Sequence, residues 1–175
     1  ICPQISLSTQ SVQKRQRKNL SPNSTESHNI VIIGAGSAGL ATSYFLKERG
    51  IEHLVLERGD VGNTWDVERW DGFYLVNPNW AVRLPGFHYT GTDPEGYLSK
   101  IETIDYLKGY AKHFGAPVRT GVSVESIEQS GEGYRLVLQS GDAIDANCVV
   151  VATGAFGIPK IPDYAENLGA SVDQM

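Results

Sequence analysis

The chain has 175 residues, of which 41% are hydrophobic and 20% charged, with a net charge of -5. This length is enough for one domain with a substantial core. The composition is that of a globular protein. No apolar run approaches the ~20 residues of a membrane span. The negative charge disfavours a general nucleic-acid binder. The two cysteines, Cys2 and Cys148, form no metal-ligand or redox motif, so we expect no metal, no disulfide framework and a cytoplasmic location.

Residues 1–28 differ from the rest of the chain. They are rich in Ser, Gln and Asn and carry four basic residues against the single acid Glu26. We expect a disordered basic tail. A basic, acid-poor segment is also compatible with an organellar transit peptide, which is the alternative interpretation.

The most informative motif is Asn29-Ile-Val-Ile-Ile-Gly-Ala-Gly-Ser-Ala-Gly39. A β-branched run ends at Gly34, and Gly36 and Gly39 complete a G-x-G-x-x-G spacing that leads into a helical pattern. Strand, glycine turn and helix in this order predict a diphosphate-binding site. Gly34 allows the sharp turn, Gly36 lets the backbone approach a pyrophosphate, and Gly39 lets the helix pack on the strand. The helix N-terminus attracts the anion.

The second half of this fingerprint is Glu57. It ends the apolar run His53-Leu-Val-Leu-Glu57 and lies 18 residues after Gly39. An acid at this spacing accepts hydrogen bonds from the ribose hydroxyls of an adenine dinucleotide. It favours an unphosphorylated ribose, as in FAD or NAD, over that of NADP. The alternative is an acid that only terminates a surface strand.

Downstream elements follow from periodicity and from turn residues. The first helix is expected over residues 37–48, with Ala38, Ala41, Thr42, Phe45 and Leu46 on its packing face. Residues 59–98 have little periodicity, which is typical of a functional stretch that contains only short structural elements. Trp70 and Trp80 are expected to anchor this stretch in the core.

Ser99 and Glu102 form a capping box that starts a second helix, and Gly115 stops it. Further predicted elements are a short strand at 118–119, a hairpin of 122–127 with 134–139, a short strand at 143–145 and a buried parallel strand at 148–152.

The order of these elements predicts an α/β domain of the Rossmann type. A parallel sheet would lie in a three-layer arrangement, with a small β-meander crossover. Because parallel strands place ligands at their carboxyl ends, Gly34, Glu57 and Gly154 can converge on one ligand.

The region from Asn29 to Asp163 resembles the FAD-binding half of two-dinucleotide-binding-domain flavoproteins. Within them it is most similar to flavin-containing and Baeyer–Villiger monooxygenases, including YUCCA-like and CzcO-like oxidoreductases. Four features carry the resemblance: the glycine motif with Glu57, the segment Gly62-Asn-Thr-Trp65, the helix from Thr103 to Phe114, and Ala152-Thr-Gly154 followed by Pro159 and Pro162.

The resemblance assigns roles to residues one by one. Residues Gly34, Gly36, Ser37, Ala38 and Gly39 would hold the FAD diphosphate, and Glu57 the adenosine ribose. The remaining cofactor contacts would be Arg58 beside the adenine, Thr64 and Trp65 near the flavin or ribityl chain, Asn77 near the ring system, Val124 at the adenine edge, and Thr153 and Gly154 near the diphosphate. No catalytic residue is assigned.

The resemblance also implies a reaction. FAD would be reduced by NADPH, would capture O₂ as a flavin hydroperoxide, and would pass oxygen to a small organic substrate. No second G-x-G-x-x-G follows residue 154. We therefore expect an incomplete FAD-binding domain at 29–163, the start of a truncated segment at 164–175, and no turnover by this chain alone.

Other flavoprotein classes fit less well. A glutathione-reductase-type enzyme would carry a Cys pair soon after the acid, where this chain has Asn63-Thr-Trp65. A thioredoxin-reductase-like oxidoreductase and a non-catalytic nucleotide-binding module remain open.

Overall fold

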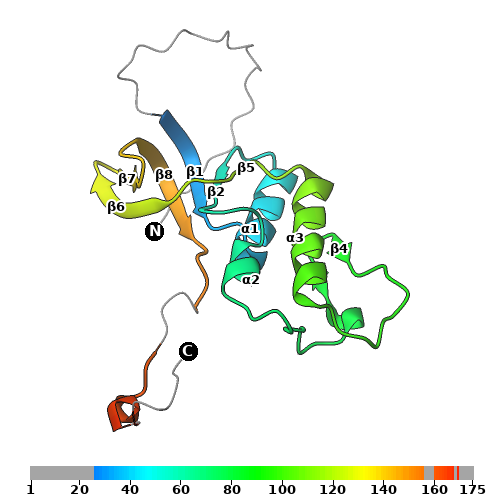
Figure 1. Ribbon diagram of the computed structural model, residues 1–175. Helices are drawn as coiled ribbons and strands as arrows, with labels where there is room; N and C mark the ends of the chain where they lie inside the picture. The colour runs from blue at the N-terminus through cyan, green and yellow to red at the C-terminus, as the bar shows by residue number, and fades with distance from the viewer. Residues whose placement is uncertain (1–25, 156–159, 168, 170–175) are drawn as a thin grey trace.

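The computed structural model describes residues 26–155, 160–167 and 169. A six-stranded sheet in the order β5-β2-β1-β8-β7-β6 forms the centre of the protein (Figure 1). Its strands are β1 (Glu26–Ile33), β2 (Leu54–Leu56), β5 (Val118–Arg119), β6 (Val124–Ser130), β7 (Gly133–Leu138) and β8 (Ala143–Val151). The four strands β5, β2, β1 and β8 are parallel, and β7 and β6 continue the sheet as an antiparallel meander. The predicted α/β fold with a mainly parallel sheet is confirmed.

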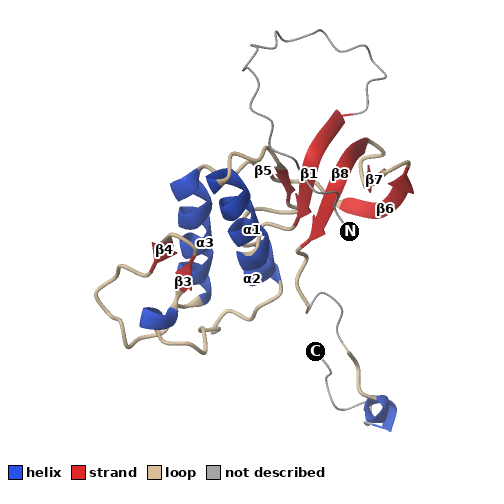
Figure 2. Cartoon of the chain, turned by 180° about the vertical axis from the view of Figure 1, so that it is seen from behind, coloured by secondary structure: helices blue, strands red, loops and turns tan. Residues whose placement is uncertain are grey.

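Two helices cover one face of the sheet, α1 (Ser37–Glu48) and α3 (Lys100–Phe114), and they lie side by side in both views (Figures 1 and 2). Alternate residues of β1 point to opposite faces. Ile32 packs in the cluster that contains Leu40 of α1 and Leu107 of α3, whereas Val31 packs with Leu136 of β7. The helices thus pack on one face of the parallel strands and the meander strand β7 packs on the other, so these three groups form three layers.

Two predicted strands are one. The expected strands at 143–145 and 148–152 join as β8, which pairs with β1 from Glu26↔Ile144 to Ile33↔Val151. Asn147 lies between the two predicted strands, and its side-chain amide donates to Asn29 Oδ1 on the neighbouring strand at 3.2 Å. Because β1 begins at Glu26, residues 26–28 of the expected tail belong to the sheet.

The first helix has the predicted bounds but a different buried face. The buried residues of α1 are Gly39, Leu40 and Ser43, whereas Phe45 is 45% exposed. Close packing at Gly39 sets the rotation of this helix, a contact that periodicity alone does not contain. The helix α3 carries the predicted capping box between Ser99 and Glu102.

The stretch between β2 and α3 contains only short elements: α2 (Asn63–Val67), the 3₁₀ turn η1 (Asn79–Ala81), and the strand pair β3 (Arg83–Leu84) and β4 (Phe87–His88). Trp70 and Trp80 are 68% and 64% exposed, so their prediction as core anchors is wrong. A further 3₁₀ turn, η2 (Asp163–Asn167), lies near the end of the described chain. In the part of the chain that the structure describes, no helix has the length and apolarity needed to cross a bilayer.

Candidate functional site

The glycine turn lies at the carboxyl end of β1, between β2 and β8. Gly34 has φ 104°, and its N–H donates to Leu56 O at 2.7 Å. A Cβ on Gly34 would lie 2.5 Å from Ala152 O, and a Cβ on Gly39 would lie 1.9 Å from Gly34 O. Both glycines are therefore required by the close approach of three backbone segments.

Gly36 differs from these two glycines. Its φ is -83°, which any residue adopts, and a Cβ added there would have no atom within 4 Å among the described residues. The need for glycine at this position is thus not internal packing. The open space in front of Gly36 is where a ligand's phosphate could approach the backbone.

The open space leads to the N-terminus of α1. Gly36 is the N-cap residue, and among the described residues no side chain caps this end and no acid lies in the first turn. The first intrahelical bond is Leu40 N–H to Gly36 O, and Ser37 and Ala38 are exposed. The backbone N–H groups that precede Leu40 have no intrahelical acceptor, so these groups and the helix dipole favour an anion at this end of α1.

Glu57 lies beside this turn. Its side chain is buried, with the residue 8% exposed. The oxygen Oε2 accepts the Ala35 N–H at 2.7 Å, and Oε1 accepts the Gly59 N–H at 3.0 Å. A carboxylate has about four acceptor positions. Two therefore remain for the hydroxyl groups of a ligand.

A recess of about 500 Å³ adjoins Glu57. The Glu57 N–H donates to Arg119 O at 3.0 Å, and the Val122 N–H donates to Glu57 O at 2.9 Å. The recess is lined by Arg58, Arg119, Gly121, Val122, Ser123, Leu138, Gln139, Ser140 and Asp142. Val124 follows this lining in the chain, at the start of β6. Sequence reasoning missed Val122 and Ser123, which are next to Val124 in the same short segment.

The Ala152-Thr-Gly154 segment completes this edge of the sheet. The Ala152 N–H donates to Ile33 O at 2.8 Å, and Thr153 N lies 3.4 Å from the position of a Cβ on Gly34. Gly154 has φ 83°. The structure thus brings Gly34, Glu57 and Thr153 to one place, although they are far apart in the sequence.

The residues expected near the flavin occupy the long connection before α3. Thr64 and Trp65 lie in α2, where the Trp65 ring packs 5.6 Å from Phe73 and lies under the Arg69 guanidinium at 5.4 Å. Asn77 is exposed. Trp65 packs against the core cluster that contains Ala35 of the glycine turn. The roles of Thr64, Trp65 and Asn77 toward a flavin stay predictions.

Sequence reasoning missed Asn79. This residue is 4% exposed, its Nδ2 donates to Asp93 O at 2.8 Å, and its backbone N–H donates to Gly96 O at 2.9 Å. Asn79 therefore links the first and second halves of the connection between β2 and α3. The Asn-Pro-Asn sequence marks a turn and gave no sign of this role.

A second recess, of about 550 Å³, lies at the opposite edge of the sheet, where Asn29, His53 and Pro117 are among its lining residues. Within the described ranges, no group of three or more His, Cys, Asp or Glu side chains is arranged to hold a metal ion.

The chain is similar to oxidoreductases of known sequence. It is 37% identical over 148 residues to an uncharacterized CzcO-like oxidoreductase of Geobacillus kaustophilus, covering 84% of this chain and 42% of that protein. It is 34% identical over 137 residues to the indole-3-pyruvate monooxygenase YUCCA1 of Oryza sativa, covering 77% of this chain and 34% of that protein. The chain therefore spans less than half the length of these relatives.

A solved structure supports the same grouping. The flavin-containing monooxygenase of Stenotrophomonas maltophilia matches with a TM-score of 0.71 and 28% identity, over 79% of this chain and 42% of that one. The resemblance inferred from the motifs is thus confirmed. The model of the pyridine nucleotide-disulphide oxidoreductase family matches residues 31–171, and the chain belongs to this family.

Proposed function

We propose that this chain is the FAD-binding part of an NAD(P)H-dependent flavoprotein monooxygenase that uses O₂ to oxygenate a small organic substrate. The names of the YUCCA1 and Stenotrophomonas relatives support this reaction class. The single observation that carries the proposal is the contact between Glu57 and the glycine turn. The acid that would bind a ribose thus lies next to the helix N-terminus that would bind a diphosphate, and this supports binding of one adenosine diphosphate group.

The residues present fit FAD. The space in front of Gly36 lacks protein atoms within 4 Å of an added Cβ among the described residues, so it can admit a diphosphate. The N–H groups of Ser37 and Ala38 would bind the phosphate oxygens. Glu57 keeps acceptor positions for the ribose hydroxyls.

The other proposed FAD contacts would lie on both sides of the diphosphate and ribose. Arg58 would lie beside the adenine, with Val124 or its neighbours in the recess wall reading the ring's edge. Thr153 and Gly154 would close over the diphosphate. Thr64, Trp65 and Asn77 would approach the flavin end.

When bound, the flavin supplies the redox chemistry, and the protein binds, orients and shields it. In this chain the rigid turn of Gly34 and Gly39 fixes the position of the helix N-terminus. Glu57 holds the turn through the Ala35 N–H and would hold the ribose through its remaining acceptor positions. The aromatic pair Trp65 and Phe73 would exclude water from the flavin end.

Two other functions remain distinct from this one. A thioredoxin-reductase-like enzyme would use the same FAD contacts with a Cys pair located elsewhere. A non-catalytic nucleotide-binding module would bind the cofactor without oxidising NADPH. The names of the relatives favour the monooxygenase. We also propose a cytoplasmic location, because the two cysteines form no motif of an oxidised protein.

The test is titration of FAD into the purified chain, followed by flavin fluorescence and visible absorption. We expect saturable binding, and we expect Gly36→Val to abolish it while lowering the free energy of unfolding by only ~1 kcal/mol, the cost of a poorer N-cap residue. Gly109→Ala in α3 is the matched control, because its Cβ would meet only the Phe87 ring at 3.6 Å or more. Lack of FAD binding by the folded, unmutated chain would contradict the proposal.

A second measurement separates the monooxygenase from the module. A full-length protein that contains this chain should oxidise NADPH and consume O₂ when loaded with FAD. Bound flavin without NADPH oxidation would favour the nucleotide-binding module.

A further inference from the structure

Two arginines line the recess beside Glu57, namely Arg58 and Arg119. Arg58 follows Glu57 directly in the chain, and the carbonyl oxygen of Arg119 accepts the Glu57 N–H at 3.0 Å. The backbones of both arginines therefore adjoin the acid that the proposed function assigns to the ribose. A free arginine at this place is what a phosphorylated ribose needs.

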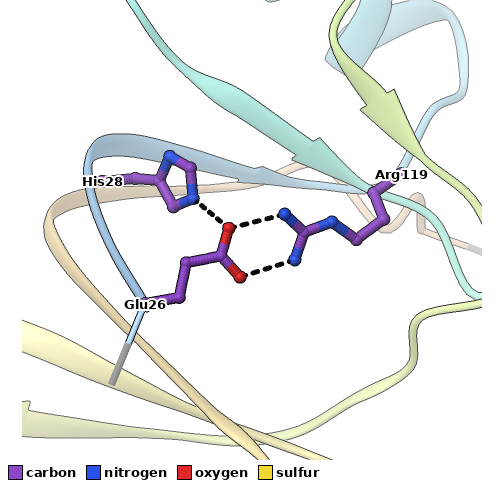
Figure 3. Close-up of polar contacts among 3 residues, drawn as sticks. All are labelled: Glu26, His28 and Arg119. Carbon is purple, nitrogen blue, oxygen red and sulfur yellow. Dashed lines mark hydrogen bonds and ion pairs between the residues drawn. The ribbon is translucent and has the colours of Figure 1, made fainter. Parts of the chain in front are cut away.

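The charge of Arg119 is paired. Its Nη1 donates to Glu26 Oε2 at 2.7 Å and its Nη2 donates to Glu26 Oε1 at 2.5 Å, so the guanidinium and the carboxylate form two parallel bonds (Figure 3). The imidazole of His28 also contacts Glu26 Oε1, at 2.7 Å. The Arg119 guanidinium lowers the pKa of Glu26 to about 2, so the carboxylate stays ionised at neutral pH.

The charge of Arg58 is paired as well. Its Nη2 donates to Glu68 Oε1, from the residue that follows α2. The Glu68 side chain is 24% exposed, whereas that of Arg58 is 55% exposed. The carboxylate is the more enclosed partner and holds the guanidinium against the end of α2.

Asp142 also lines the recess, and its carboxylate accepts a hydrogen bond from Ser140 at 2.9 Å. The lining thus holds two paired arginines and one acid, and Glu57 adjoins it through the backbone. A phosphate on the ribose carries a charge of about -1.5 to -2 near neutral pH. It would meet no uncommitted cation among these residues.

We propose that Glu26 and Glu68 are specificity-determining residues, which neutralise the two arginines of the recess so that it accepts an adenine nucleotide with an unphosphorylated ribose and rejects one with a 2′-phosphate. This inference rests on the proposed function, because it assumes that the adenosine lies beside Glu57. It assigns the choice between the two nucleotides to a pair of acids outside the glycine fingerprint, in addition to Glu57.

The test compares the affinity of the chain for ADP and for ADP bearing a 2′-phosphate, by calorimetry or by competition with FAD. The variants are Glu26→Gln and Glu68→Gln. Each should raise the ratio of the 2′-phosphorylated affinity to the ADP affinity by roughly twofold to fivefold, as expected for one newly available surface charge pair. A variant that only loosened the fold would lower both affinities and leave the ratio unchanged.

Asp145→Asn is the matched control. Arg135 and Asp145 form the same kind of two-bond pair, at 2.8 and 3.0 Å, on β7 and β8 and outside the lining of the recess. This variant should leave the ratio unchanged. In the Glu68→Gln background, the additional change Arg58→Ala should return the ratio to its original value.

The outcomes separate two failures. If the unmutated chain binds ADP but neither acid variant changes the ratio, or if Asp145→Asn changes it equally, the inference is wrong and the proposed function stands. If the folded, unmutated chain binds no ADP, the proposed function fails and the inference fails with it. If one variant does not fold, the other still decides.

Discussion

The carboxylate of Glu57 accepts a hydrogen bond from the Ala35 N–H at 2.7 Å, and this bond joins the end of β2 to a turn 22 residues earlier. The other carboxylate oxygen holds the Gly59 N–H. The acid is thus part of the framework of the turn, in addition to its proposed contact with a ribose.

Replacing Glu57 should therefore change both stability and binding. Glu57→Ala leaves two backbone N–H groups without their acceptor, and we expect a loss of about 1–3 kcal/mol in the free energy of unfolding. FAD affinity should fall by a further ~1–3 kcal/mol, from the lost charge-assisted bonds. Urea unfolding and FAD titration measure the two effects. Glu57→Gln keeps one acceptor oxygen and should lose less stability and less affinity. An alanine variant equal to the original protein in both assays would contradict both roles of Glu57.

The glycines of the motif should separate packing from binding. Gly39→Ala places a Cβ 1.9 Å from Gly34 O, so α1 must shift, and we expect a loss of about 1–3 kcal/mol or more in stability. Gly36→Ala meets open space among the described residues and should cost only ~0.5 kcal/mol, because alanine is a poorer N-cap residue than glycine. Both variants should bind FAD more weakly. Equal destabilisation by the two substitutions would contradict the steric account.

The pair between Glu26 and Arg119 predicts a pH dependence of stability. The pKa of Glu26 falls from 4.5 to about 2 in the folded protein, chiefly through the hydrogen bond from Arg119. A depressed carboxyl pKa stabilises the fold above the unfolded pKa, and the contribution disappears as pH falls through 4.5 towards 2.

Unfolding of the original protein and of Glu26→Gln should be compared at several pH values. The difference in unfolding free energy between the two proteins should be largest at neutral pH. It should stay below ~1 kcal/mol because the pair is partly exposed. It should narrow on acidification. A gap that widens below the unfolded pKa would show that another group is responsible.

Tyr110 offers a test of the core. Its side chain is fully buried in α3, burial raises the pKa of its hydroxyl, and that hydroxyl has no hydrogen-bond partner among the described residues. Tyr110→Phe should therefore be neutral or stabilise the protein by up to ~1 kcal/mol. Tyr106 is the matched case, because its hydroxyl donates to Phe87 O at 2.9 Å. Tyr106→Phe should lower the free energy of unfolding by about 0.5–1.5 kcal/mol. A thermal midpoint lower for Tyr110→Phe than for Tyr106→Phe would refute this explanation.

The elements that could be predicted from the sequence are those specified by adjacent residues. The box formed by Ser99 and Glu102 marked the start of α3, and the glycine spacing marked the turn and α1. The parallel sheet followed from the order of these elements. Gly34, Glu57 and Gly154 could be expected together because all three follow parallel strands.

The failures involve contacts between distant segments. The rotation of α1 depends on the approach of Gly39 to Gly34 O, which helical periodicity cannot contain. The exposed ring of Trp80 went unpredicted because burial was inferred from residue type alone. The pair of Glu26 with Arg119 spans 93 residues, and no local pattern marks either partner.

An NMR titration of the chain with ADP, observed at the backbone amides, tests most directly whether the glycine turn and Glu57 bind one nucleotide. The account predicts simultaneous, saturable shifts at Gly36, Ser37 and Ala38 on one side and at Gly59 and Val122 on the other, with the same affinity at both. Shifts at only one of these two groups, or at neither, would contradict the claim that the glycine turn and Glu57 bind one adenine nucleotide.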